Sequence, residues 1–457
     1  LSGKTPADPD ITAMALCALA PDQENDAVKT AAERGLGCLS AMQNADGTFG
    51  APTAESCAQV VLALHELGLA PDDAWFTKGG VSALEALLTF ARSDGSFSHV
   101  SGGMADQMAT EQALCALAAQ EVEDLLASMT LEEKVGQLFF VQVPDAEAVS
   151  DVSTYHLGGY ILFGRDTADQ TADSLIQTIQ SYQDAAAADT GIPLLIGVDE
   201  EGGTVVRVSS NPHLRSAKFP SPQKAYASGG MEAVLADTRE KDLLLSALGF
   251  NVNLAPVADV STDPDDFIYD RSFGQTADAT ADYVSQVVSQ MAADNMGSVL
   301  KHFPGYGNNV DTHTGIAVDK RPLETFETSD LLPFQAGFQA GGGKTAVLVS
   351  HNIMTAVDDS LPASLSPKVH GLLRTDLGFD GVVMTDDLAM EAVAAYAADG
   401  AVAVMALEAG NDLVITTDYR TQIPKVIEAV EGGTLSEDTI DTACRRVLTW
   451  KQELGLI

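Results

Sequence analysis

The sequence predicts an α/β protein, a (β/α)8 barrel of the TIM type preceded by an all-α repeat segment. From about residue 121, short apolar runs alternate with helical stretches, which indicates a parallel sheet covered by helices on both faces. Before that point, alanine and leucine recur at helical spacing and the chain repeats itself. We therefore expect two domains, 1–120 and 121–457, as the length of 457 residues also favours.

The first domain contains two repeated patterns. ALCALA occurs at 15–20 and at 113–118, and NADGTFG at 44–50 is echoed by RSDGSFS at 92–98. Units of this length with two helices each bury their faces only by stacking on neighbours, and the Asp-Gly pairs fit turns between helices. We expect stacked helical hairpins, with a plain helical bundle as the alternative.

Eight apolar runs are expected to form the strands of the barrel. They are QLFFVQV (137–143), GGYILFG (158–164), PLLIGVD (193–199), NVNLAPVAD (251–259), SVLKHFP (298–304), TAVLVSH (345–351), GVVMTDD (381–387) and DLVITT (412–417). Helical segments separate them, and LSEDTIDTACRRVLTWKQELG closes the chain. Eight such units fit a barrel with long loops. A doubly wound open sheet is the alternative, although no GxGxxG motif follows an early strand.

Charge and composition argue against several classes of protein. The net charge of −40 is spread along the chain, whereas nucleic acids and anionic membranes bind basic patches. No apolar run reaches the roughly 18 residues that span a bilayer, and the chain starts at Leu1 without a basic, apolar leader. The five cysteines form no CxxC or Cys/His cluster. We expect no metal site and no cofactor.

Polar side chains gather at the carboxyl ends of five of the expected strands, where barrel enzymes place their active sites. They are Asp199, Asp259, Lys301-His302, Ser350-His351 and Asp386-Asp387. Taken singly, a strand-end aspartate is often a helix cap, and a lone histidine is more often structural than catalytic. Because all five positions meet on one rim, the sequence indicates a site for a polar ligand.

Four motifs in residues 122–457 together resemble glycoside hydrolase family 3, in its β-N-acetylhexosaminidase branch. They are DEEGGTVVR (199–207), DRSF (270–273), KHFPGYGNNVDTHTG (301–315) and PASLSPKVHGLLRTDLGFDGVVMTDDLAM (362–390). The resemblance implies a retaining exo-β-N-acetylglucosaminidase that acts through a covalent glycosyl-enzyme. Its substrates would be carbohydrates derived from chitin or from cell-wall peptidoglycan.

The resemblance implies catalytic roles for three residues. Asp386, the first aspartate of MTDDLAM, matches the nucleophile, and a carboxylate suits that role because it forms and releases a glycosyl ester. His313 matches the general acid/base, with Asp311 orienting its ring. An imidazole titrates near pH 6.5, so it can donate and later accept a proton near neutral pH. We interpret Asp387 as structural, capping a helix that would begin at Leu388.

The same resemblance implies a set of residues that bind the sugar. They are Asp199, Arg207, Arg271, Lys301, His302 and His351. The chain departs from the family pattern at Tyr306, where the family has histidine between two glycines, and at Glu200, where it usually has glutamine. The stretch between Lys301 and Asp311 is also one residue short. We expect Gly305 and Gly307 to let this loop swing over a bound sugar.

The helical domain carries a second resemblance. Gln43, Gly47 and Phe49 follow a helix in the Gln-x-x-x-Gly-x-Phe pattern of the prenyltransferase and squalene-cyclase repeats. About two and a half such repeats are present, without an Asp-rich cyclase motif or a set of zinc ligands. We expect this domain to be a partial α/α toroid, the tail of a longer helical domain, and to be non-catalytic.

Other functions stay open on the sequence alone. A β-glucosidase or β-xylosidase of the same family generally takes its acid/base from a carboxylate on a later domain, and we expect no such domain after this barrel. A phosphorylase is possible because an uncharged histidine does not repel phosphate. A carbohydrate-binding surface module without activity is the non-enzymatic alternative. We expect a location outside the cell or at its surface, with the cytoplasm and the oligomeric state left open.

Overall fold

The computed structural model describes residues 7–20, 25–307, 309, 317–390, 393, 396–397 and 400–457. The chain divides into two compact units, Leu1–Ser128 and Met129–Ile457, called unit 1 and unit 2 below. The expected boundary at 120/121 falls inside helix α5 (Gln107–Ser128), which continues to the end of unit 1. No helix in the described part of the chain is long and apolar enough to cross a membrane.

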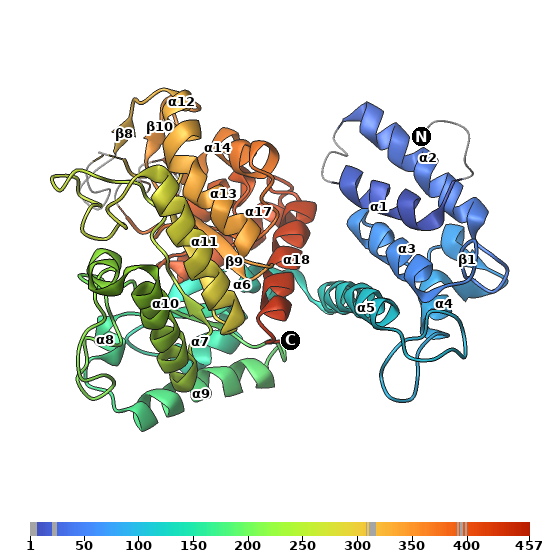
Figure 1. The fold of residues 1–457 in the computed structure, drawn as a ribbon, viewed down its shortest axis with the longest axis horizontal. Helices are drawn as coiled ribbons and strands as arrows, with labels where there is room; N and C mark the ends of the chain where they lie inside the picture. Colours follow the sequence, from blue (N-terminus) through green and yellow to red (C-terminus); the bar gives the residue numbers. More distant parts are fainter. Residues whose placement is uncertain are drawn as a thin grey trace. The chain divides into compact units, whose positions relative to one another are not determined.

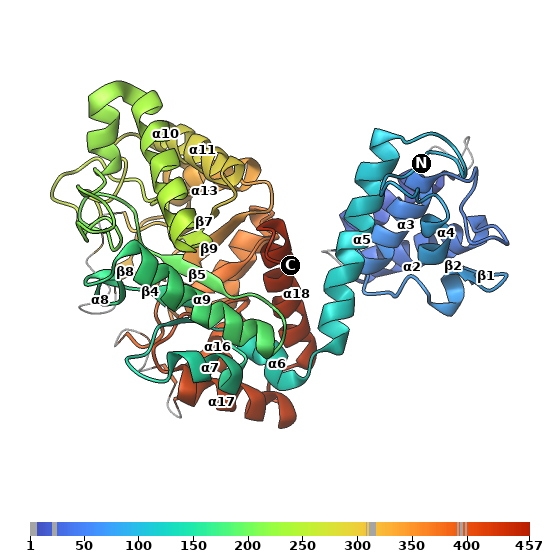
Figure 2. The same ribbon diagram turned by 90° about the horizontal axis from the view of Figure 1, so that it is seen from below.

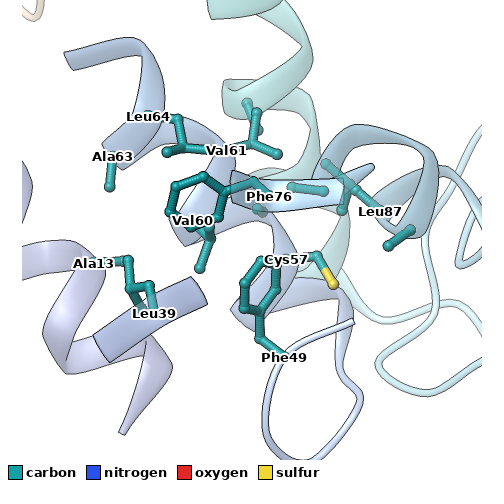
Figure 3. Packing of buried hydrophobic residues seen from close by; sticks show 14 of the residues in the cluster. Ala13, Leu39, Phe49, Cys57, Val60, Val61, Ala63, Leu64, Phe76 and Leu87 are labelled. Atoms are coloured by element: carbon teal, nitrogen blue, oxygen red, sulfur yellow. The ribbon is translucent and has the colours of Figure 1, made fainter. Parts of the chain in front are cut away.

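Unit 1 is built around helix α3 (Ala54–Glu66), which packs against α1 (Pro9–Leu19) and α5. Figure 3 shows Val60, Val61 and Leu64 of α3 in the core of this unit. The remaining elements are α2 (Asp26–Met42), α4 (Ala83–Leu88), a 3-10 turn at Ala74–Phe76 and the strands β1 (Thr77–Lys78) and β2 (Val81–Ser82). Because β1 and β2 pair antiparallel, the unit is not purely α-helical.

The two echoed Asp-Gly sequences of unit 1 form the same turn. Gln43 bridges Phe49 in the first copy, and Ala91 bridges Phe97 in the second. In each copy the aspartate accepts hydrogen bonds from the backbone N–H and the hydroxyl of the residue two positions on, with hydroxyl distances of 2.6 Å in both. The sequence repeat is therefore a structural repeat of these turns, while the likeness to squalene-cyclase toroids stays a prediction.

Unit 2 contains a curled, fully parallel sheet covered by helices (Figures 1 and 2). The strand order is β11-β9-β7-β6-β5-β4-β3. The strands are β3 (Phe140–Gln142), β4 (Gly159–Leu162), β5 (Leu195–Val198), β6 (Val252–Asn253), β7 (Gly297–Phe303), β9 (Thr345–Val349) and β11 (Val383–Thr385). Each lies within one of the apolar runs or begins one residue before it, and nearly every strand residue is buried, as a sheet covered on both faces requires.

Helices follow the strands along the chain of unit 2. The longer ones are α6 (Leu131–Gln137), α7 (Ala148–Tyr155), α9 (Ala172–Ala188), α10 (Pro222–Leu248), α11 (Ala277–Ala293), α13 (Leu331–Ala340), α16 (Val402–Ala409), α17 (Tyr419–Glu431) and α18 (Glu437–Glu453). The shorter ones are α8 (Gly164–Thr167), α12 (Leu323–Thr325), α14 (Pro367–Gly371), the π-helical turns Phe326–Asp330 and Leu372–Asp376, and the 3-10 turn Ala363–Leu365.

The eighth expected run takes a different form. Residues 413 and 414 make isolated parallel bridges, Leu413 to Met384 next to β11 and Val414 to Phe139 next to β3. Val414 donates to the carbonyl of Leu138 at 2.7 Å, and Leu413 donates to that of Val383 at 3.0 Å. The two edges of the curled sheet therefore bond to two adjacent residues, the β11 edge to Leu413 and the β3 edge to Val414.

A second, small parallel sheet was not expected from the sequence. Strand β8 (Val318–Asp319) pairs with β10 (Ile353–Met354), which comes shortly after β9. Thr355 adds bonds from its backbone N–H and hydroxyl to the carbonyl of Asp319, at 3.0 and 2.8 Å. This pair ties the segment after β7 to the segment after β9, beyond the carboxyl ends of the main strands.

Candidate active site

The carboxyl ends of strands β5 and β7 bring three charged side chains into direct contact. The ammonium of Lys301, in β7, lies 2.7 Å from Asp199 and 2.6 Å from Glu201, both in the turn after β5. Lys301 is almost fully buried. Burial lowers its pKa, but the two carboxylates outweigh burial and hold the pKa of Lys301 above its usual value. It is therefore a fixed cation between two anions.

Arg271 continues this charged array on the other side of Glu201. Its Nε and Nη2 donate to the two oxygens of Glu201, at 3.0 and 2.8 Å, in the paired geometry that fits a guanidinium to a carboxylate. Burial opposes the charge on Glu201, but Lys301 and Arg271 outweigh it and hold the pKa of Glu201 well below its usual range. Glu201 is thus an anion shared by two cations.

His302 is oriented from both sides of its ring. Its Nδ1 lies 2.7 Å from Asp259 Oδ2, and its Nε2 lies 3.1 Å from Arg271 Nη2. Since a guanidinium only donates, Nε2 must accept, and Nδ1 must carry the proton that goes to Asp259. Asp259 is fully buried and also accepts the backbone N–H groups of His302 and Tyr306, at 3.1 and 2.7 Å. This aspartate fixes the orientation of the ring and keeps a proton on Nδ1.

Arg207 faces the same array from the loop after β5. Its Nη2 lies 3.9 Å from Asp199, and its guanidinium stands 5.9 Å from the centre of the Phe163 ring. Its Nε is buried and has no hydrogen-bond partner among the described residues. An unpaired buried donor is costly, so this N–H is an unsatisfied donor beside the array.

Glu200 belongs to the scaffold of this loop. Its carboxylate accepts the backbone N–H groups of Arg207, Val208 and Ser209, two of them at 2.8 and 2.7 Å, and the Ser209 hydroxyl. The side chain is fully buried. It therefore holds the DEEGG loop in shape and presents no proton to a ligand. The glutamine usual at this position in the family would carry no such charge for the N–H groups to bind.

Asp386 follows β11, and its backbone is fixed by β9. Its N–H donates to the carbonyl of Val349 at 3.0 Å, and its Oδ1 accepts the N–H of Asp387 at 2.9 Å. Asp387 in turn accepts the N–H of Ala389 at 2.9 Å. Residues 388–390 form a turn, so Asp387 caps a turn and not a helix beginning at Leu388. Burial raises the pKa of Asp387.

His351 lies behind this turn. It is fully buried, with Nε2 3.0 Å from the carbonyl of Asp387 and Nδ1 2.7 Å from the Ser364 hydroxyl. Because a carbonyl only accepts, Nε2 carries the proton. Through these two contacts His351 supports the backbone next to Asp386, and the sugar-binding role expected for it stays a prediction.

The loop after β7 begins with a bend that contains Gly305 and Gly307. Asp311 and His313 lie outside the described residues. Gly305 and Gly307 have positive φ angles of 120° and 54°. A Cβ at Gly305 would lie 2.6 Å from Asp330 Oδ1, and one at Gly307 would lie 2.4 Å from Arg321 Cζ. Both glycines are therefore needed for close packing of this bend, whereas the sequence suggested that they serve loop movement.

Residues 130–450 match the family described as the glycosyl hydrolase family 3 N-terminal domain. The chain belongs to this family. It is a glycoside hydrolase, and the sequence resemblance of unit 2 is confirmed. Among the described residues, no three His, Cys, Asp or Glu side chains are arranged to hold a metal ion.

Family 3 relatives with published names are similar to unit 2. The chain is 32% identical over 337 residues to "Beta-hexosaminidase LpqI" of Mycobacterium tuberculosis, covering 71% of this chain and 84% of that protein. It is 33% identical over 291 residues to a "Beta-hexosaminidase" of Stenotrophomonas maltophilia, covering 61% and 82%.

Solved structures of family 3 enzymes are also similar to unit 2. A family 3 β-N-acetylglucosaminidase from Paenibacillus sp. FPU-7 superposes with a TM-score of 0.67 at 32% identity, covering 72% of this chain but only 63% of that one. The M. tuberculosis LpqI structure gives a TM-score of 0.64 at 29% identity, covering 71% and 95%. These likenesses confirm an α/β fold with a parallel, curled sheet.

Sequence reasoning omitted Glu201 and left Asp259 without a role. Glu201 sits within DEEGG, two residues after Asp199, and its two cationic partners come from distant segments of the chain. The signal that could have found it was its place in DEEGG, beside Asp199 at a rim that was also expected to receive the cations Lys301 and Arg271. The structure brings Asp199, Lys301, Arg271 and His302 together with these two carboxylates.

Proposed function

We propose that this chain is a retaining exo-β-N-acetylglucosaminidase, which removes terminal β-linked N-acetylhexosamine from cell-wall or chitin-derived sugars. The observation that carries the proposal is the ordered polar array around Glu201 at the carboxyl ends of β5 and β7. The names of the relatives support the choice of substrate. Such sugars lie outside the membrane, so we place the enzyme outside the cell or at its surface.

The array has the donors and acceptors that a terminal sugar requires. An ammonium has three N–H donors, of which Lys301 directs two at Asp199 and Glu201. Its third donor, the Nε of Arg207 and the second lone pairs of Asp199 are the groups that would meet the sugar hydroxyls. Since the cations and anions already fix each other, the site would bind sugar without rearranging. Preorganised groups of this kind increase affinity by lowering the ordering cost.

In the proposed mechanism, Asp386 attacks the anomeric carbon while the bond to the leaving oxygen breaks. That oxygen takes a proton from His313, whose ring Asp311 would orient. Water then attacks the glycosyl ester, gives its proton to His313 and regenerates Asp386. Glu200, the other acidic side chain next to Asp199, is not proposed as the acid because it is buried against backbone N–H groups.

Two finer features complete the proposal. We take residues 413–414 to complete the sheet as an eighth, minimal strand, which would close a (β/α)8 barrel. We take unit 1 to be a non-catalytic helical repeat segment, since all the groups named above belong to unit 2.

A panel of nitrophenyl β-glycosides, assayed with and without phosphate, tests the proposed function. We expect the N-acetylglucosaminide to be cleaved far faster than the glucoside or xyloside. Free N-acetylglucosamine should be the product in both buffers. A sugar phosphate formed in phosphate buffer would instead indicate a phosphorylase, and preference for the glucoside or xyloside would reject the substrate assignment. Absence of cleavage with binding intact would indicate a carbohydrate-binding module.

A further inference from the structure

A small cavity lies beside the charged array, between the sheet and helices α10 and α11. Glu201, Arg271 and Asp242 of α10 are among the residues that line it. Its volume of about 20 Å³ exceeds the roughly 10–15 Å³ that one water molecule needs. The cavity is thus large enough for a water and too small for a larger ligand.

Asp242 is the unexplained group at this cavity. The residue is 1% exposed, and neither carboxylate oxygen has a hydrogen-bond partner among the described residues. An ionised carboxylate in such a place is very unfavourable without a partner. A neutral carboxylic acid is a donor and an acceptor, and a single water can satisfy both.

The charged neighbours of Asp242 are committed elsewhere or are anionic. On α10, Lys241 lies 3.0 Å from Asp237 and donates to the backbone carbonyl of Glu201 at 3.2 Å. On α11, Tyr283 also lines the cavity. Asp294, which follows α11, adds a further negative charge near Asp242. None of these groups offers Asp242 a free cation.

We propose that the cavity holds a bound water molecule, and that Asp242, kept as a neutral carboxylic acid, acts through this water as a positioning residue for Glu201 and Arg271. The water would connect helix α10 to the back of the sugar site. Lys241 makes the second connection from the same helix, to the Glu201 carbonyl. Helix α10 would thereby hold the DEEGG turn at two points.

The proposal has a consequence for pH. Burial, with the charge of Asp294, raises the pKa of Asp242 to about 7. Above that pH the buried anion would compete with Glu201 for Arg271 and for Lys241. Sugar affinity should therefore fall as the pH rises through about 7. The expected fall in sugar affinity depends on the proposed function. The bound water and the protonated state of Asp242 do not depend on it.

Unfolding of the full chain tests the protonated state without any assay of activity. Trp75→Phe leaves Trp450 in unit 2 as the one tryptophan, so its fluorescence reports unit 2. In this background we compare Asp242, Asp242→Asn and the exposed control Glu232→Gln at pH 5 to 8. The unfolded chain loses the Asp242 proton near pH 3.9 and the folded chain near pH 7.

Between these values the folded state alone keeps the proton, so stability falls as the pH rises. The folding constant of the parent, divided by that of Asp242→Asn, should drop about tenfold per pH unit from pH 5 to 7 and then level off. The folding constant of the parent, divided by that of Glu232→Gln, should stay constant over the same pH range. A flat ratio for Asp242→Asn as well would overturn the proposal, and so would a crystal structure of the full chain with a dry cavity.

Calorimetry with free N-acetylglucosamine tests the link to the sugar site. The parent should lose affinity several-fold between pH 6.5 and 8.5, whereas Asp242→Asn should keep it. Equal pH dependence in both proteins would reject Asp242 as a positioning residue. If no protein binds N-acetylglucosamine at any pH, the proposed function fails, and the unfolding series and the cavity water still decide the protonated state of Asp242.

Discussion

At the scale of single residues, hydrogen-bond partners distinguish histidines that look alike in the sequence. His302 and His351 both end buried strands. His302 accepts from Arg271, and therefore carries its proton on Nδ1, while His351 donates from Nε2 to a backbone carbonyl. His302 adjoins the charged array, and His351 supports the turn that carries Asp386. The sequence cannot separate these roles because the partners come from loops and turns elsewhere in the chain.

The nucleophile assignment predicts a specific loss at Asp386. Asp386→Asn removes the attacking charge but keeps the volume, so turnover of aryl N-acetylglucosaminide should fall by several orders of magnitude. Circular dichroism should show an unchanged fold. Added azide should restore cleavage and give the α-azide, since it attacks the face that the carboxylate has vacated. Turnover within tenfold of the parent would exclude Asp386 as the nucleophile.

The acid/base assignment predicts that the effect of His313→Ala depends on the leaving group. A sugar leaving group needs a proton, so disaccharide cleavage should fall by about 10²–10⁴-fold. A nitrophenolate departs unprotonated, so the first step on aryl substrates should be nearly unchanged, and slow hydrolysis should follow a burst. Rapid-mixing kinetics separates the steps, with Asp311→Ala expected to show the same pattern more weakly. If the rate of the first step fell equally on disaccharides and on aryl substrates, His313 would have only a binding role.

The lowered pKa of Glu201 predicts that unit 2 loses stability at low pH. Its pKa in the folded chain lies below the unfolded value of about 4.3. Its stabilising contribution is therefore complete above about pH 5 and is lost as the pH falls through the folded pKa. Glu201→Gln leaves Lys301 and Arg271 without their shared anion and should destabilise unit 2 by on the order of 3 kcal/mol at pH 7.

Denaturant unfolding between pH 3 and 7 measures this effect. The difference between the parent and Glu201→Gln should shrink below about pH 4, whereas the exposed Glu232→Gln should differ little from the parent at every pH. A difference that does not change with pH would show that lost packing, and not the buried charge, explains the destabilisation.

At the scale of elements, helix α18 carries a buried lysine that works against stability. Lys451 is fully buried, and its ammonium contacts the side-chain oxygen of Gln137 at 2.6 Å. Burial lowers its pKa to about 7. Unfolded lysine titrates near 10.4, so between these values the unfolded chain binds the extra proton. Because of this lysine, the free energy of unfolding therefore rises from pH 7 to 10.

Lys451→Met keeps the length of the side chain and removes this penalty. We expect the variant to stabilise unit 2 by on the order of 2 kcal/mol at pH 7, measured by denaturant unfolding. The gain should diminish towards pH 10, where the parent lysine is neutral when folded and when unfolded. Lys425→Met, on the neighbouring helix α17, is the control. A gain that persists unchanged at pH 10 would point to improved packing alone.

Elements with a strong local signal were predictable, and those defined by distant partners were not. Strands β3 to β7, β9 and β11 were found because buried parallel strands are continuous apolar runs. The charged side chains at their ends follow from the same pattern. The role of Glu201 and the β8–β10 pair depend on segments far apart in sequence. The expected domain boundary falls inside α5, because the sequence changes within this one helix from the alanine-rich stretch 113–119 to the acidic stretch EVEDLLAS.

At the scale of the whole molecule, the two units contain their own cores, and the family match begins at residue 130. The capping box of α6 begins at Thr130, whose hydroxyl accepts the N–H of Glu133 at 3.3 Å, while the Glu133 carboxylate accepts that of Thr130 at 2.7 Å. Unit 2 therefore has a complete start of its own. A cut at 121 would instead leave the last turns of α5 attached.

A truncated protein of residues 129–457 should consequently fold and keep its activity. We expect kcat/KM on aryl N-acetylglucosaminide within about threefold of the full chain, because every group of the proposed mechanism lies in unit 2. The same protein with Asp386→Asn is the control for residual activity. Trp450 fluorescence should give the same denaturation midpoint in the truncated protein and in the full chain carrying Trp75→Phe. A folded but inactive 129–457 protein would mean that unit 1 contributes to the site, and a lower midpoint would mean that unit 1 stabilises unit 2.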